Sequence, residues 1–106
     1  MGIDIANNIK AVELLKVETL QKLTDLFGDI AAEANGETTD RIAEDGAALI
    51  CSVYLLCHRL GVDFLEMDTK MKAMLRTGMQ EKHLLERRFG DLQTLLDCLE
   101  ERKDEQ

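Results

Sequence analysis

A chain of 106 residues and 12.0 kDa has room for one modest hydrophobic core, so we expect a single domain over residues 1–106. Hydrophobic residues make up 45% of the chain and charged residues 32%, a balance that excludes an intrinsically disordered protein. The net charge is −8 and the basic residues form no cluster, which argues against nucleic acid and anionic membranes as partners.

Good helix formers dominate the sequence, proline is absent and aromatic residues are only 4%, so we expect an all-α fold built as a four-helix bundle. The first helix is predicted over residues 9–34, where apolar residues recur every three or four positions. This stripe contains Ile9, Val12, Leu20, Leu23, Phe27 and Ile30. Asp25 and Asp29 fall opposite the stripe on a helical wheel, and we expect both to face solvent. The alternative is that an antiparallel hairpin brings them level with Glu44 and Asp45 as replacement metal ligands.

The second helix is predicted over residues 39–60. Between positions 47 and 57 only Ser52 is plainly polar, so this helix is apolar on almost every side and should lie at the centre of the fold. The other helices of one short chain are too few to cover it. We therefore expect a homodimer or a higher homo-oligomer.

The three cysteines and the absence of a long apolar run bear on the cellular compartment. Cys51, Cys57 and Cys98 lie in apolar helical stretches without a Cys-x-x-Cys pair, so we expect reduced core residues. No apolar run reaches the ~18 residues of a membrane span, and no signal-peptide pattern is present. These features favour a cytoplasmic protein.

The second helix is expected to end at Gly61, where glycine adopts the left-handed conformation at little steric cost. Val62 then supplies the apolar contact of a Schellman-type helix end. Asp63 can cap the next helix, and Glu66 can return the hydrogen bond as in a capping box. Local physics therefore accounts for the whole corner.

The third helix is predicted over residues 64–77, with a methionine stripe that favours an adaptable core or a subunit interface, and Gly78 is expected to end it. The fourth helix is predicted over residues 80–102. Its apolar face contains Leu85, Phe89, Leu92, Leu95, Leu96 and Leu99. His83 lies opposite this face and is expected at the surface, while residues 101–106 are expected to form a solvated tail.

Three segments together resemble the short MazG-like family of the all-α nucleoside triphosphate pyrophosphohydrolase superfamily. They are IKAVELLK at residues 9–16, LGVDF at residues 60–64 and ERRFGDL at residues 86–92. The resemblance implies a helical bundle that dimerises or tetramerises. In active relatives, carboxylates hold Mg²⁺ and a nucleoside triphosphate is cleaved to the monophosphate and pyrophosphate.

The resemblance also implies where metal ligands should stand. The superfamily uses Glu-x-x-Glu on one helix and Glu-x-x-Asp on the next, because residues three apart share a helix face. The second motif falls on Asp45 and Ala48, and the first on Glu13 and Lys16. Alanine offers no ligand and lysine repels a cation, so we expect a degenerate site with Asp45 as its one candidate ligand. Mg²⁺ is the expected cofactor only if the chain is active.

Glu13 and Lys16 fall beside the apolar stripe of the first helix, where a charge is costly unless it is paired. Two explanations stay open at this point. The two residues can form an (i, i+3) ion pair. Alternatively, they line a polar ligand pocket that Tyr54, His58 and Arg88 complete, in which Lys16 and Arg88 meet a phosphate or another anion.

We therefore expect a MazG-like protein with a degenerate metal site that binds a nucleotide or a related anion. One alternative is an active Mg²⁺-dependent nucleoside triphosphate pyrophosphohydrolase with rearranged ligands. Another is a non-catalytic dimerising module that binds a protein partner through its third and fourth helices. The sequence assigns no catalytic residue, and it contains neither a glycine-rich phosphate loop nor a constellation for nucleophilic catalysis.

Overall fold

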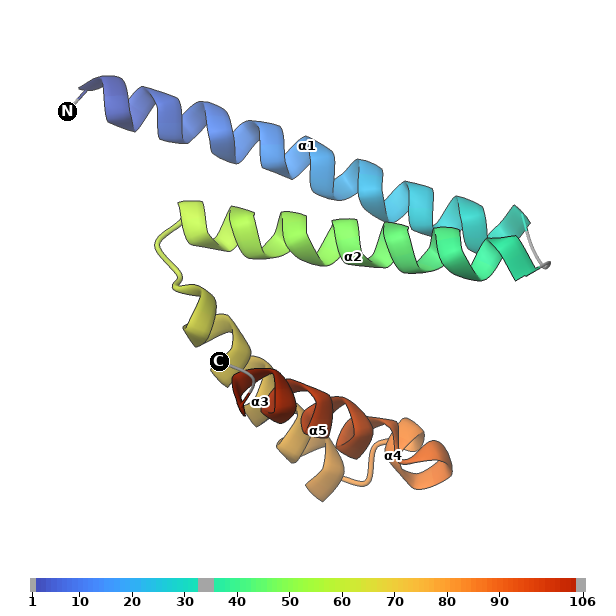
Figure 1. Ribbon diagram of the computed structural model, residues 1–106. Helices are drawn as coiled ribbons and strands as arrows, with labels where there is room; N and C mark the ends of the chain where they lie inside the picture. Colours follow the sequence, from blue (N-terminus) through green and yellow to red (C-terminus); the bar gives the residue numbers. More distant parts are fainter. Residues whose placement is uncertain (1, 33–35, 105–106) are drawn as a thin grey trace. The chain divides into compact units, whose positions relative to one another are not determined.

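The structure is a computed structural model that describes residues 2–32 and 36–104, and these residues form five α-helices and no strand (Figure 1). The helices are α1 (Gly2–Ala32), α2 (Gly36–Arg59), α3 (Phe64–Gln80), α4 (Leu84–Phe89) and α5 (Asp91–Asp104). The predicted all-α class is confirmed. The helices divide into two compact units, residues 1–63 and residues 64–106, which are described in turn.

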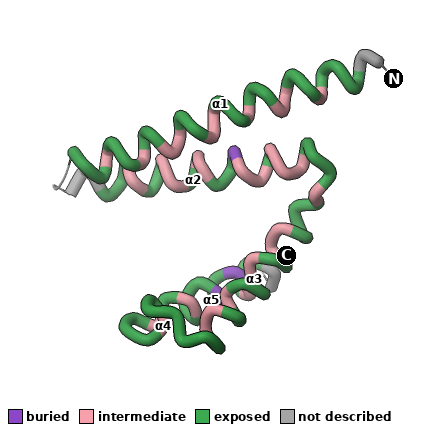
Figure 2. The backbone as a smooth tube through the Cα atoms, turned by 180° about the vertical axis from the view of Figure 1, so that it is seen from behind, coloured by how far each residue is buried: buried purple, intermediate pink, exposed green. Residues whose placement is uncertain are grey.

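The first unit is an antiparallel hairpin of α1 and α2 (Figure 1). Partly buried residues lie along one side of α1 in alternating steps of four and three, the spacing at which helices pack lengthwise. They are Asn8, Val12, Leu15, Thr19, Lys22, Leu26 and Asp29. On α2, Ser52 is only 4% exposed. Figure 2 shows residues of intermediate exposure along much of both helices.

The prediction for the packed side of α1 was wrong in part. Val12 and Leu23 are partly buried as expected, but much of the predicted stripe is exposed. Four residues define what we term the outer apolar face of α1: Ile9 (58% exposed), Leu20 (67%), Phe27 (62%) and Ile30 (51%). The apolar residues of α1 span an arc wider than one neighbouring helix covers, and α2 packs on the adjoining part of that arc.

The corner after α2 forms as predicted. Gly61 has a φ of 98°, and its N–H donates to the carbonyl of His58 at 3.0 Å. The N–H of Val62 donates to the carbonyl of Cys57 at 2.9 Å, which completes the Schellman pair of hydrogen bonds. The capping box of Asp63 and Glu66 stays a prediction.

Gly61→Ala is expected to lower the free energy of unfolding by about 1–2 kcal/mol, because a Cβ atom strains the backbone at this positive φ. Chemical denaturation measures the change. Gly28→Ala is the matched control, since Gly28 lies inside α1 with no atom close to an added Cβ. That substitution should stabilise by about 0.5–1 kcal/mol through helix propensity. Equal effects of the two substitutions would contradict the assignment.

The second unit pairs α3 with α5 around Leu96 and Leu99, which are 7% and 6% exposed. Gly78 does not end α3 as predicted, because the helix continues to Gln80. The glycine instead permits a close approach between helices. A Cβ atom at Gly78 would lie 2.8 Å from Cδ1 of Leu92.

The predicted fourth helix is broken into α4 and α5 at Gly90, whose φ of 69° is left-handed. The N–H of Gly90 donates to the carbonyl of Glu86 at 3.0 Å and closes α4. His83 caps the start of α4 and lies exposed, as predicted. The helix α5 continues through residues 101–104, so most of the predicted tail is helical; residues 105–106 lie outside the described part of the chain.

A charged cluster joins α3 to the end of α5. The guanidinium of Arg76 donates to a carboxylate oxygen of Glu100 at 2.8 Å, and Nζ of Lys72 lies 3.7 Å from the other oxygen. Lys72 is only 9% exposed, whereas the Glu100 side chain is 46% exposed. Glu100 therefore neutralises a cation that is largely withdrawn from water.

The predicted core position is wrong for Cys51 and Cys98, which are exposed, whereas Cys57 is partly buried; all three are free thiols.

Within the described residues, no single helix is long and apolar enough to cross a membrane. Only as a broken pair do residues 39–59 and α3 pass that test, by length and composition alone.

Candidate functional site

The hairpin of the first unit brings two acidic residues together. Asp29 is the last of the evenly spaced residues along the packed side of α1, and Asp45 lies opposite it on α2. Their carboxyl groups are within hydrogen-bonding reach of one another, and both residues are partly buried. The expectation that Asp29 faces solvent was therefore wrong, because α2 packs beside the predicted stripe of α1 rather than on its centre.

The environment of Asp45 favours its neutral form. The hydrogen bond with Asp29 is the largest cause that raises the pKa of Asp45 from 3.8 to about 6. Partial desolvation and the negative charges of Asp29, Asp25 and Glu44 act in the same direction. One oxygen of Asp45, Oδ2, is buried, and no hydrogen-bond partner reaches it from the described residues. A shared proton or a cation would compensate this oxygen.

The raised pKa of Asp45 predicts that the free energy of unfolding falls as the pH rises. The folded-state pKa of about 6 exceeds the ordinary 3.8, so folding favours the protonated carboxyl. The contribution of Asp45 to stability is full below pH 3.8, falls between pH 3.8 and about 6, and is constant above that range. Asp45→Asn should remove this dependence, because a neutral amide stays neutral across the range.

The prediction is checked by the denaturant midpoints of the wild type and of Asp45→Asn, measured from pH 4 to pH 7. This pH range covers most of the interval between the ordinary pKa of 3.8 and the folded-state pKa of about 6. Asp63→Asn is the control, since Asp63 is exposed at the corner after α2 and lies outside the carboxyl pair. The control should follow the wild-type curve. A wild-type slope that survives unchanged in Asp45→Asn would contradict the assignment to Asp45.

The Asp29–Asp45 pair has the kind of ligand that a divalent cation prefers, but two carboxylates are too few to hold the cation alone. Carboxylate oxygens are the ligands that Mg²⁺ prefers, and Oδ2 of Asp45 is buried without a donor. Nevertheless, among the side chains of residues 4–32 and 39–102 no three His, Cys, Asp or Glu are placed to hold a metal ion by themselves. Mg²⁺ is often bound by one or two carboxylates together with the phosphates of a substrate. The pair therefore suits a cation that arrives with a phosphate ligand.

Glu13 and Lys16, the first two members of the predicted ligand pocket, form an exposed ion pair on α1. Nζ of Lys16 is 3.2 Å from a carboxylate oxygen of Glu13, with the side chains 57% and 64% exposed. The structure thus shows the (i, i+3) ion pair, and such exposure does not make a buried wall for a pocket.

The remaining three members of the predicted pocket lie on α2 and α4. Tyr54 and His58 are one turn apart on α2 and partly buried, and Arg88 is exposed on α4 in the second unit. A role of Glu13, Lys16, Tyr54, His58 and Arg88 in ligand binding stays a prediction.

Asp29 was expected to face solvent rather than to lie level with Asp45, and that choice between the two alternatives was wrong. The signal for Asp29 lies in a second spacing series through Leu15, Thr19 and Leu26, which runs beside the more apolar stripe and ends at Asp29. The more hydrophobic series attracted the prediction, although the second series is the one that packs on α2. An antiparallel hairpin then brings Asp29 level with Asp45.

Comparison with known proteins supports the resemblance noted in the sequence. The sequence model of the MazG-like family matches residues 5–92, which include the whole packed region of the hairpin, α3 and α4. No curated protein and no solved structure matches the chain significantly. The family match covers most of the sequence, and the all-α fold agrees with it. The chain therefore belongs to the MazG-like family, which has the fold of the nucleotide pyrophosphohydrolase superfamily.

Proposed function

We propose that this protein binds a nucleoside triphosphate together with Mg²⁺ at the Asp29–Asp45 pair. The observation that supports the proposal most directly is the juxtaposition of these two carboxyl groups on the α1–α2 hairpin. Membership of the MazG-like family supports a phosphate-bearing ligand. The site is degenerate in our proposal, since it offers two carboxylates, whereas active relatives of the superfamily use four.

Each acidic residue has a distinct part in this proposal. Asp29 and Asp45 would hold the cation, with Oδ2 of Asp45 gaining the partner that it lacks among the described residues. Asp25 and Glu44 add negative potential that attracts the cation without a direct contact. When bound, Mg²⁺ would neutralise phosphate charge and polarise a phosphate oxygen.

Thermal unfolding with separate and combined ligands tests the proposal. The samples contain Mg²⁺ alone, a nucleoside triphosphate alone, or both, across a panel of ribo- and deoxyribonucleotides. A two-carboxylate site predicts clear stabilisation only with both present, because each ligand completes the binding site of the other. Equal stabilisation by the nucleotide with and without Mg²⁺ would exclude the carboxyl pair as a cation site. No stabilisation by any combination would exclude nucleotide binding.

An active pyrophosphohydrolase is the second candidate function, and the position of Asp29 favours it. This residue places a carboxylate beside Asp45 from outside the usual Glu-x-x-Glu position, as a rearranged ligand set requires. Release of pyrophosphate with Mg²⁺ or Mn²⁺, lost in Asp45→Ala, would establish catalysis. If the protein neither binds nor cleaves nucleotides, a non-catalytic interaction module that uses α3, α4 and α5 becomes the better account.

We also propose that the protein is a homodimer or a higher homo-oligomer. The outer apolar face of α1 is exposed, and Ile50 and Leu55 on α2 are 57% and 47% exposed. Burial of such side chains is worth about 25 cal/mol per Å². Light scattering at micromolar concentration should give a mass at least twice the 12.0 kDa of one chain. Phe27→Glu should lower the mass, whereas Thr24→Glu, at an exposed polar position of the same helix, should not.

The cytoplasm is the compartment that we propose for this function. Nucleoside triphosphates and Mg²⁺ occur there together, and a reducing environment keeps the three free cysteines from forming disulfides. The net charge of −8 makes nucleic acids and anionic membranes unsuitable partners.

A further inference from the structure

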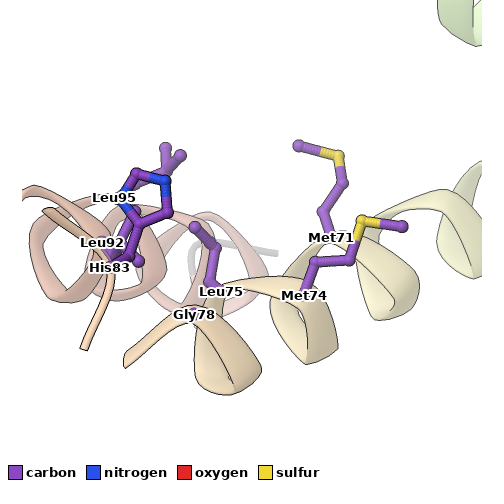
Figure 3. A pocket seen from close by; sticks show the side chains of 7 residues that line it. All are labelled: Met71, Met74, Leu75, Gly78, His83, Leu92 and Leu95. Carbon is purple, nitrogen blue, oxygen red and sulfur yellow. The ribbon is translucent and has the colours of Figure 1, made fainter. Parts of the chain in front are cut away.

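A cavity of about 260 Å³ opens between α3 and α5 in the second unit (Figure 3). Its wall is almost entirely apolar. The side chains that shape it are Met71, Met74, Leu75, Leu92, Leu95 and His83. Two methionine side chains stand on one side of the cavity, and the His83 ring stands on the other, beside Leu92 and Leu95 (Figure 3).

The local sequence explains why this space exists and why it can adapt. Gly78 lies in the wall without a side chain, and α5 approaches it so closely that an added Cβ would lie 2.8 Å from Leu92 Cδ1. Methionine side chains are unbranched and polarisable, so Met71 and Met74 can adjust to ligands of different shape. Met74 is 71% exposed, which leaves the mouth of the cavity open to solvent.

The imidazole of His83 is the polar group in the wall of the cavity. Its Nδ1 accepts a hydrogen bond from the backbone N–H of Leu85 at 3.1 Å, as the N-cap of α4. A ring nitrogen that accepts a hydrogen bond holds no proton, so the neutral imidazole carries its proton on Nε2. The capping bond therefore makes His83 a hydrogen-bond donor at the edge of an apolar wall.

We propose that this cavity binds a small apolar molecule, about the size of one substituted aromatic ring, that carries a hydrogen-bond acceptor. The volume lies just below the roughly 300–1,000 Å³ of common small-molecule sites, so it suits a ligand smaller than a nucleotide. The apolar wall drives binding, and Nε2–H of His83 orients the acceptor. Among the side chains that the structure describes, no lysine or arginine lines the cavity, so a triphosphate does not fit this site.

A matched pair of probes tests the proposal on the full chain. Acetophenone carries a carbonyl acceptor, and ethylbenzene has nearly the same shape without one. Methionine labelled at the methyl carbon provides the signal in NMR titrations. Both probes should shift Met71 and Met74, while Met67 and Met79 on the same helix, which do not line the cavity, should stay in place. Equal shifts at all four methyl groups would overturn the proposal as unspecific adsorption.

Two substitutions of His83 separate its two roles, which are the N-cap of α4 and the hydrogen-bond donor to the ligand. Asparagine keeps a cap acceptor and a donor, whereas ionised aspartate keeps the cap and offers no donor. Acetophenone should bind His83→Asp about two- to tenfold more weakly than it binds the wild type or His83→Asn. Ethylbenzene should bind all three alike, and Leu95→Phe should weaken both probes by filling the cavity. Unchanged acetophenone affinity in both His83→Asp and Leu95→Phe would overturn the proposal.

Discussion

Asp45→Ala is expected to abolish the joint stabilisation of the protein by Mg²⁺ and a nucleoside triphosphate. At ligand concentrations 100-fold above the dissociation constant, the wild type should gain about 2.7 kcal/mol. Loss of one of two carboxylate ligands should weaken binding by about 100-fold, which leaves under about 0.5 kcal/mol under the same conditions. The physical reason is that Asp29 alone cannot hold the cation beside the phosphates.

The variants must be compared by the increase in stability that the ligands cause in each protein, and not by absolute stability. Removal of Asp45 also relieves its repulsion with Asp29, so the unliganded variant should itself be more stable than the wild type. Asp29→Asn should lose the increment as Asp45→Ala does. Asp63→Asn is the matched control, because Asp63 is exposed and is not among the charges that act on Asp45. A full increment in Asp45→Ala would contradict the proposed site.

Glu100→Gln is expected to lower the free energy of unfolding by about 1–3 kcal/mol. The substitution keeps the shape of the side chain and removes the charge that faces Lys72, which is only 9% exposed. The partly exposed Glu100 keeps this cost below that of a fully buried pair. Arg76 adds little, since its side chain is 54% exposed and water can replace its partner.

Chemical denaturation of three further variants separates a buried charge from general surface effects. Lys72→Met should recover much of the stability when it is combined with Glu100→Gln, because the uncompensated ammonium group is then absent. Glu13→Gln makes the same substitution in the exposed pair with Lys16 and should change stability by less than about 0.5 kcal/mol. Equal costs of Glu100→Gln and Glu13→Gln would contradict the role of burial.

The corner after α2 shows how much of the fold local sequence can predict. Gly61 and Val62 adopt the expected conformation because the hydrogen bonds that end α2 involve only residues within the same turn. The left-handed break at Gly90 was missed, although it uses the same chemistry. The leucines on both sides of Gly90 keep a helical spacing, so the apolar pattern hid the break between α4 and α5.

Gly78 illustrates the opposite error. A glycine near the end of an apolar stripe usually indicates a helix end, and the prediction followed that rule. Here the residue lies within α3 because α5 comes too close for a side chain. A close approach between residues far apart in the chain leaves no local signal in the sequence.

The sequence by itself determined the all-α class, the family and the positions of the main helices. Only the tertiary structure decided which side of α1 packs against α2, because its apolar arc is wider than one contact and hydrophobicity does not rank the parts of that arc. The register of the hairpin then placed Asp29 beside Asp45. Proximity of two like charges across a helix pair depends on packing, so only the tertiary structure could decide between a solvent-facing Asp29 and one beside Asp45.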